Sequence, residues 1–416
     1  MSLPVDELLA ARRVLLLQGP MGDFFQQLGS WLESYAIECH KVNFNAGDWF
    51  FYSGRNAVNY YGRLDHFKIW LKQHLQDKRI DSVVCFGDCR FYHEKAKCLT
   101  EELGLKFFVF EEGYIRPDYI TLERDGVNDF SCIKQKFINL SNELPFPDKP
   151  EVVNSSYKKM VFSACLYYLL WTVFFWLFPF YKHHRQISPL AELFYWMRSF
   201  IRRAINYQVE PRRFLDIIKK YDKHYFIVAL QVHNDSQVRV HSDYNDVEEF
   251  ILEVLTSFAS SAPADKHLVF KHHPMDRGYR NYNYLLTKHA LALGIMDRVH
   301  YICDVHLPTL LKHSIGLVAI NSTTGLQALF HDKPVKVTGR AIYNLPKLTY
   351  QGELNQFWKN PGRVNRLAYR RFRYALVHYS QLNGSFYGAS PWMTKSSNLQ
   401  ISPMDLQNLS SQKVKF

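Results

Sequence analysis

Short apolar runs that end in glycine-rich or polar turns recur through the first third of the chain. Between these runs the apolar positions are spaced as in amphipathic helices, and one such helix is expected from about residue 23 to residue 34. Strands that alternate with helices predict βαβ units and a mostly parallel, doubly wound sheet. The predicted strands cover residues 14–17, 82–86 and 106–110. Residues 10–150 are therefore expected to form one α/β domain.

A second series of apolar runs begins near residue 223 and predicts a second doubly wound domain over residues 223–358. Its strands are expected at residues 225–230, 268–270, 299–301 and 316–320. A basic amphipathic helix follows, from about residue 363 to residue 381, and residues 359–388 are expected to pack back across the first domain. The tail, residues 389–416, is rich in Ser, Asn and Gln and is predicted to be disordered.

The segment between the two domains, residues 151–222, has a different pattern. Residues 160–180 contain 21 residues without a charge, nine of them aromatic, and residues 181–223 hold ten Lys or Arg against four Asp or Glu. Three interpretations remain open: an interfacial helix in anionic lipid, a transmembrane helix, and a buried helical hairpin. The aromatic residues favour the interfacial helix, because Trp and Tyr prefer the headgroup region to the hydrocarbon centre.

Composition narrows the choice of partners and of compartment. At 416 residues the chain is long enough for two domains, and its net charge of +12 favours an anionic partner such as nucleic acid, anionic lipid or a phosphorylated substrate. The basic residues cluster beside the apolar aromatic segment, which disfavours nucleic acid. Seven cysteines without paired Cys-x-x-Cys spacing predict neither a disulfide framework nor a zinc site, and no signal peptide is expected at the acidic N-terminus. A cytoplasmic protein is therefore expected.

His273 and Pro274 follow the predicted strand 268–270, with Lys271 and His272 between. Ligands of open α/β sheets bind at the carboxyl ends of strands, and Pro274 biases its predecessor toward extended geometry. An imidazole at this place suits contact with a phosphate or a nucleotide. The alternative is a His-Pro loop without chemistry.

Two further polar clusters follow strands of the second domain. Asp235 comes shortly after the strand 225–230 and is placed like a nucleophile, a base or a metal ligand; its alternative role is that of an ordinary N-cap. Asn321, Ser322 and Thr323 precede a helix expected from residue 326. Hydroxyls and free N–H groups at a helix N-terminus favour an anion such as phosphate, and ordinary capping is compatible with that role.

In the first domain, Glu111 and Glu112 follow the strand 106–110, so both carboxylates are expected to face the cleft. Burial or mutual repulsion would raise one pKa toward that of a working acid or base, and the alternative is a solvated acidic turn. Gly19, Gly22 and Gly87 lie in turns that allow close backbone approach, but they match neither the dinucleotide fingerprint nor a Walker loop.

Together these motifs resemble the KpsS-type capsule polysaccharide proteins of Gram-negative bacteria, which are similar to GT-B glycosyltransferases that use CMP-activated sugars. The resemblance spans roughly residues 12–388. The matching segments are 15–22, 85–90, 110–114, 234–237, 271–278, 321–323, 333–334 and 348–352. The acidic pair and the His-Pro pair are also similar to motifs of bacterial sialyltransferases.

The resemblance implies a GT-B-like fold, in which two Rossmann-type domains face a cleft, and a retaining β-Kdo glycosyltransferase. Kdo would pass from CMP-Kdo to a phosphatidylglycerol-type lipid and start the poly-Kdo linker of group 2 capsules. Asp235 would be the nucleophile and Glu111 or Glu112 the acid/base. The implied CMP-Kdo-binding residues are Lys271, His273, Pro274, Asn321, Ser322 and Thr323.

No metal ion or other cofactor is implied, because CMP leaves as an anion that needs only stabilisation of its phosphate. The implied location is the inner face of the inner membrane, with peripheral attachment and with other capsule synthesis and export proteins as partners. Two alternatives remain: a non-catalytic, lipid-anchored scaffold of the capsule assembly complex, and a sugar-nucleotide epimerase of GT-B shape.

Overall fold

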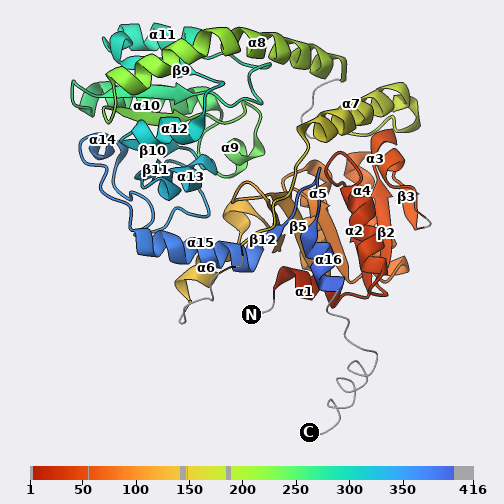
Figure 1. Cartoon of the computed structure of the whole chain (residues 1–416). Helices are drawn as coiled ribbons and strands as arrows, with labels where there is room; N and C mark the ends of the chain where they lie inside the picture. The colour runs from red at the N-terminus through yellow and green to blue at the C-terminus, as the bar shows by residue number, and fades with distance from the viewer. Residues whose placement is uncertain (1–2, 55, 141–146, 148, 184–188, 398–416) are drawn as a thin grey trace.

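The computed structural model describes residues 3–54, 56–140, 147, 149–183 and 189–397 of the chain. Two α/β bodies are visible in Figure 1, one coloured red to orange and the other green to blue. The first contains a seven-stranded sheet and the second a five-stranded sheet. Both doubly wound domains predicted from the sequence are therefore present.

The first sheet has the strand order β12-β6-β5-β4-β1-β2-β3. Its inner strands pair in parallel, whereas β6 runs antiparallel to both β5 and β12. The strands are β1 Arg13–Leu16, β2 Glu38–Asn43, β3 Ala57–Asn59, β4 Ser82–Phe86, β5 Lys106–Glu112, β6 Tyr119–Arg124 and β12 Gln381–Asn383. The helices of this domain are α1 Pro4–Leu9, α2 Phe24–Glu33, α3 Ala46–Phe51, α4 Phe67–Asp77, α5 Phe91–Leu103 and α6 Ile133–Ile138. Apolar clusters lie on both faces of the sheet, as its continuous hydrophobic runs predicted.

The second sheet is parallel throughout, in the order β11-β10-β7-β8-β9. Its strands are β7 Tyr225–Ala229, β8 His267–Lys271, β9 Val299–Ile302, β10 Gly316–Ala319 and β11 Val335–Val337. The helices are α9 Ser236–Val240, α10 Val247–Ser261, α11 Asn283–Ala292, α12 Leu307–His313, α13 Thr324–Phe330 and α14 Leu354–Phe357. Each face of this sheet also carries a buried apolar cluster, so helices cover the sheet on both sides.

The C-terminal part of the chain returns to the first domain. Helix α15, Arg366–Ser380, leads into β12, which adds an edge strand to the first sheet (Figure 1). The predicted return helix is therefore confirmed. The prediction of a disordered tail from residue 389 is wrong for its first part, because α16, Pro391–Ser397, packs on this domain through the buried Trp392. Residues 398–416 lie outside the described part of the chain.

The segment between the domains forms α7, Tyr157–Val173, a short 3₁₀ turn at Phe175–Leu177, and the long helix α8, Pro189–Lys220. No helix in the described residues is both long enough and apolar enough to span a bilayer. The interpretation as a buried hairpin is wrong, because Phe162 and Trp176 are 68% and 62% exposed. Two doubly wound domains with a C-terminal return are the GT-B-like arrangement that was expected.

Candidate active site between the two domains

Loops at the carboxyl ends of the two sheets meet at the domain interface. Cys89, which follows β4, places its Sγ 3.8 Å from Nε2 of His241, which follows β7 and α9. Nearby, the Nε of Arg340 lies 3.4 Å from a carboxylate oxygen of Asp129 in the other domain. The carboxyl ends of parallel strands are where open α/β sheets bind ligands, so this interface is the candidate active site.

Glu111 and Glu112 are the last two residues of β5, and the strand therefore extends two residues beyond its predicted end. Successive strand residues point to opposite faces, so the expectation that both carboxylates face the cleft is wrong. Burial raises the pKa of Glu111 to about 7, although its Oε1 accepts the backbone N–H of Glu112 at 3.0 Å. The Glu112 side chain is half exposed and lies 3.8 Å from the guanidinium of Arg116.

Gly87 brings the backbone close to Glu111. Its φ is +71°, which favours glycine, and a Cβ at this position would lie 3.5 Å from Oε2 of Glu111. Arg90 lies beside both residues and donates to the side-chain oxygen of Gln18 at 3.1 Å and to the carbonyl of Gly19 at 3.3 Å. Of the three glycines predicted for the cleft, Gly87 therefore adjoins the acidic residue directly.

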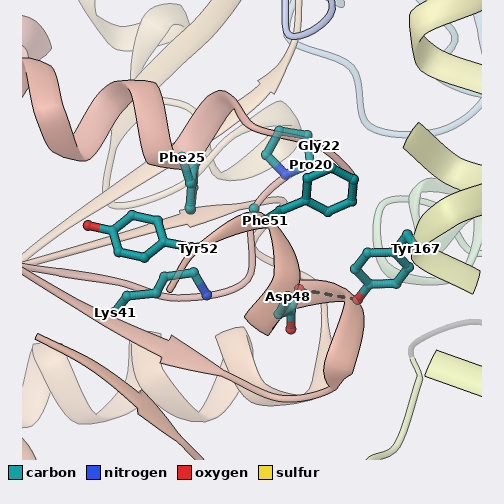
Figure 2. Close-up of a pocket in the computed structure, with 9 residues that line it drawn as sticks. Pro20, Gly22, Phe25, Lys41, Asp48, Phe51, Tyr52 and Tyr167 are labelled. Carbon is teal, nitrogen blue, oxygen red and sulfur yellow. Dashed lines mark hydrogen bonds between the residues drawn. The ribbon is translucent and has the colours of Figure 1, made fainter. Parts of the chain in front are cut away.

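Gly19 and Gly22 instead line a small pocket of the first domain, shown in Figure 2. Its space of about 10 Å³ suits a single water molecule. Asp48 accepts a hydrogen bond of 3.2 Å from Tyr167, which α7 contributes, and burial lowers the pKa of Lys41 to about 8. The sequence did not indicate this cluster, because Lys41 lies inside a strand and Tyr167 is far away along the chain. The contact attaches α7 to the first domain.

Lys271 belongs to β8 rather than to the loop after it. Its ammonium donates to the carbonyl oxygens of His272, at 3.1 Å, and of Cys303, and burial lowers its pKa. The ammonium of Lys271 is therefore hydrogen-bonded to backbone carbonyls at the base of the His-Pro loop.

His273 lies in the loop after β8, and its Nδ1 accepts the backbone N–H of Met275 at 3.2 Å. Burial lowers the pKa of His273 to about 4, and the charge of Lys271, with a smaller contribution from Arg116 of the first domain, acts in the same direction. The ring is therefore neutral at pH 7. Since Nδ1 is an acceptor, Nε2 carries the proton and can donate to a phosphate.

Asp235 is the N-cap of α9, and its side chain accepts the backbone N–H of Gln237 at 2.9 Å. The capping role considered for it is therefore confirmed. A carboxylate has two oxygens with several lone pairs, so capping by itself is compatible with a further role in catalysis. Its role as nucleophile stays a prediction.

Asn321 donates from its side chain to the carbonyls of Gln237 at 2.8 Å and His241 at 3.0 Å, which holds the loop around α9 against the end of β10. Ser322 accepts the backbone N–H of Thr324 at 3.2 Å, whereas Thr323 makes no side-chain cap in the described structure. Helix α13 starts at Thr324, two residues before the predicted start. Asn321 therefore borders the α9 segment that Asp235 caps, and Ser322 and Thr323 follow it at the start of α13.

The loop that carries the His-Pro pair is held by α8, a contact that the sequence did not indicate. Arg198 donates to the carbonyls of Gly278 and Tyr279, the latter at 2.8 Å, and Arg202 donates to those of Arg277 at 2.7 Å and Arg280 at 3.1 Å. A Cβ on Gly278 would lie 2.2 Å from a backbone oxygen of α8, so only glycine permits this approach.

Histidines and carboxylates in this region are paired rather than gathered around one point. His233 contacts Asp276, which sequence reasoning had not singled out, at 2.6 Å. Across the described ranges, no group of three or more His, Cys, Asp or Glu side chains is arranged to hold a metal ion.

Similarity to known proteins extends over most of the chain. A family model described as capsule polysaccharide biosynthesis protein matches residues 81–387. The capsule polysaccharide export protein KpsS of Escherichia coli is 40% identical over 383 residues, which are 91% of this chain and 98% of that protein. The capsule polysaccharide modification protein LipB of Neisseria meningitidis serogroup A is 40% identical over 407 residues, with 95% and 96% covered. Among solved structures, the β-Kdo 2,7-transferase KpsC of Thermosulfurimonas dismutans is similar with a TM-score of 0.42 and 15% identity, over 92% of this chain and 99% of that chain.

Proposed function

Since this chain belongs to the capsule polysaccharide biosynthesis protein family, we propose that it is a retaining β-Kdo glycosyltransferase. It transfers Kdo from CMP-Kdo to a phosphatidylglycerol-type lipid and so starts the poly-Kdo linker of a group 2 capsular polysaccharide. The reaction uses no metal ion or other cofactor. Other capsule synthesis and export proteins receive the lipid-linked product.

The observation that most supports this proposal is the raised pKa of Glu111. A carboxyl whose pKa burial raises to about 7 exchanges its proton near neutral pH, which is the property of a general acid or base. It lies at the carboxyl end of β5, on the edge of the first sheet that meets the second domain. Glu112 is exposed and beside Arg116, so we assign the acid/base role to Glu111 alone.

The donor binds to the second domain in this proposal. The Nε2–H of His273 and the hydroxyls of Ser322 and Thr323 hold the CMP phosphate, while Asp235 attacks the anomeric carbon of Kdo and CMP departs with the bonding electrons. The acceptor oxygen then displaces Asp235, and Glu111 takes the acceptor's proton. Two displacements at one carbon retain its configuration.

The lipid acceptor requires a protein that reaches a bilayer surface, and α7 and α8 have the composition for it. Helix α8 exposes apolar side chains along most of its length, and basic side chains are exposed toward its C-terminal half. The exposed apolar residues are Leu193, Phe194, Met197, Phe200, Ile201, Ile205, Tyr207, Val209 and Leu215. The exposed basic residues are Arg203, Arg212, Arg213, Lys219 and Lys220. An apolar face beside basic residues suits peripheral attachment to anionic lipid at the inner face of the inner membrane.

The proposal is tested by mass spectrometry of the lipid after purified protein has been incubated with CMP-Kdo and phosphatidylglycerol vesicles. The expected product is a lipid heavier by Kdo, made by the wild type and not by Asp235→Asn. Asp235→Asn keeps a side-chain oxygen for the N-cap bond to Gln237, so it removes the carboxylate while preserving the local structure.

A preparation that binds CMP and vesicles but makes no adduct would contradict the transferase and favour the non-catalytic scaffold. Adduct formation by Asp235→Asn at the wild-type rate would exclude Asp235 as the nucleophile and leave the transferase intact. The two results are distinguished within one experiment.

A further inference from the structure

His233 and Asp276 form a hydrogen-bonded pair at the carboxyl end of the second sheet. The Nδ1 of His233 lies 2.6 Å from Oδ1 of Asp276. The carboxylate is completely buried, whereas the imidazole side chain is 19% exposed. The carboxylate of Asp276 therefore lies inside the protein, and the ring of His233 is partly accessible to solvent at the edge of the sheet.

The pair joins two neighbouring strands of the donor domain. His233 follows β7 and Asp276 follows β8, and these strands pair in parallel with Ala229 opposite Lys271. The backbone N–H of Asp276 donates to the carbonyl of His273 at 2.9 Å. The short loop after β8 thus positions two imidazoles: His273 within the loop itself, and His233 through Asp276.

The side chain of Asp276 is hydrogen-bonded to His233, and its charge also acts on the neighbouring His272 and His273. Its Oδ2 has no hydrogen-bond partner among the described residues, and its Oδ1 contacts the ring of His233. A buried carboxylate is unfavourable unless it is paired, and a carboxylate that caps a loop accepts backbone N–H groups. Among the described residues, the side-chain partner of Asp276 is therefore an imidazole and not a backbone N–H group of the loop.

An accepting carboxylate at Nδ1 fixes the orientation of an imidazole and stabilises the imidazolium, which leaves Nε2 to transfer a proton. We propose that His233, positioned by Asp276, is a catalytic general acid that serves the departing CMP phosphate. This inference rests on the proposed transferase and adds a proton donor on the donor side of the cleft, opposite Glu111.

In the first displacement, the bond between the anomeric carbon and the phosphate oxygen breaks while Asp235 forms its bond to that carbon. The electron pair passes to the phosphate oxygen, and the Nε2–H of the His233 imidazolium transfers its proton to that oxygen. Asp276 keeps its bond to Nδ1 throughout. The neutral imidazole then recovers a proton from water after CMP has left.

The test measures CMP release from CMP-Kdo, with and without phosphatidylglycerol vesicles, for the wild type and for His233→Asn. The asparagine amide nitrogen reaches the place of Nδ1, so this variant keeps a donor to Asp276 and loses the acid at Nε2. We expect kcat for CMP release to fall about 100-fold in both conditions, with KM changed less than about threefold. His313→Asn is the matched control, because His313 contacts Asp222 at 2.8 Å near the start of β7.

Asp276→Asn tests the positioning role through a double-mutant cycle. It should lower kcat in the wild type and have little further effect in the His233→Asn background, because it acts through the same ring. An additional loss of equal size would show that Asp276 acts independently of His233.

A His233→Asn protein with wild-type kcat would overturn the assignment while the transferase stands. A variant that loses only transfer to lipid, and still releases CMP into water normally, would move His233 to the acceptor side and also overturn it. A wild type that binds CMP but releases none from CMP-Kdo would refute the transferase and, with it, this inference.

Discussion

The backbone N–H of Met275 donates to Nδ1 of His273 across a distance of 3.2 Å. This bond decides which ring nitrogen carries the proton, because a backbone N–H can only donate. Burial lowers the pKa of His273 to about 4, so the ring offers a neutral donor at Nε2 over the whole physiological range of pH. The His-Pro loop therefore presents a hydrogen-bond donor rather than a positive charge.

His273→Ala should weaken CMP binding roughly tenfold or more, as expected for loss of a hydrogen bond to a charged acceptor. Because the ring is already neutral, the loss should be the same at pH 6.5 and pH 8. Isothermal titration with CMP measures it, with the exposed His306→Ala as the control. Unchanged affinity would remove His273 from the phosphate site, and an effect confined to pH 6.5 would contradict the neutral donor.

Glu111→Gln should lower kcat about 100-fold, whereas Glu112→Gln should change it less than about threefold. Glu111 has its pKa raised to about 7 by burial, so its base form increases between pH 6 and pH 8, and the ratio of the wild-type rate to the Glu111→Gln rate should rise over that interval. Initial rates of lipid glycosylation at several pH values test both statements. The reverse ranking of the two variants would place the acid/base at Glu112.

His272→Phe should make stability less sensitive to acid. His272 is 2% exposed, lies between the rings of Tyr282 and Tyr301, and has no partner for either ring nitrogen within the described structure. Burial lowers its pKa to about 4, below the usual value of 6.5, so the unfolded state binds a proton first and stability is lost as pH falls from about 6.5 toward 4.

Urea denaturation at pH 7.5 and pH 5 measures this effect. The variant should lose about 2 kcal/mol less than the wild type between the two pH values. At pH 7.5 it should be at least as stable, because an unpaired buried polar group has been replaced by an apolar ring of similar size. An equal loss in both proteins would show that His272 does not contribute to acid sensitivity.

Ile201→Ser should weaken binding to phosphatidylglycerol vesicles about tenfold, since burying one isoleucine side chain stabilises by about 1.5–3 kcal/mol. Ile201 is 62% exposed on α8, and Ile69, on α4 of the first domain, is 74% exposed. Ile69→Ser is therefore a control of the same chemistry on another surface. Vesicle sedimentation compares the two, and equal effects would place the lipid-binding surface away from α8.

The strands were predicted well where they are buried on both faces. Strand β4 has its predicted ends, and β7 and β8 differ from prediction by one or two residues, because continuous apolar runs bounded by polar turns are a local property. Strand β5 is longer than predicted because its last residues pair with β6, with Glu111 opposite Thr121 and Glu112 opposite Ile120. That pairing separates the two carboxylates onto different faces.

The sequence by itself determined the two doubly wound domains, the helix that returns to the first domain, and the positions of His273, Asp235 and Glu111 at strand ends. These follow from periodicity and from turn residues, which act over a few neighbours along the chain. Only the tertiary structure decided that Glu111 is the more buried of the two acids, that Asp276 holds His233, and that α16 forms within the predicted disordered tail. Each of these depends on contacts between residues that are distant in the chain. Burial raises the pKa of Glu111 and stabilises short elements such as α16, and it exists only once those contacts have formed.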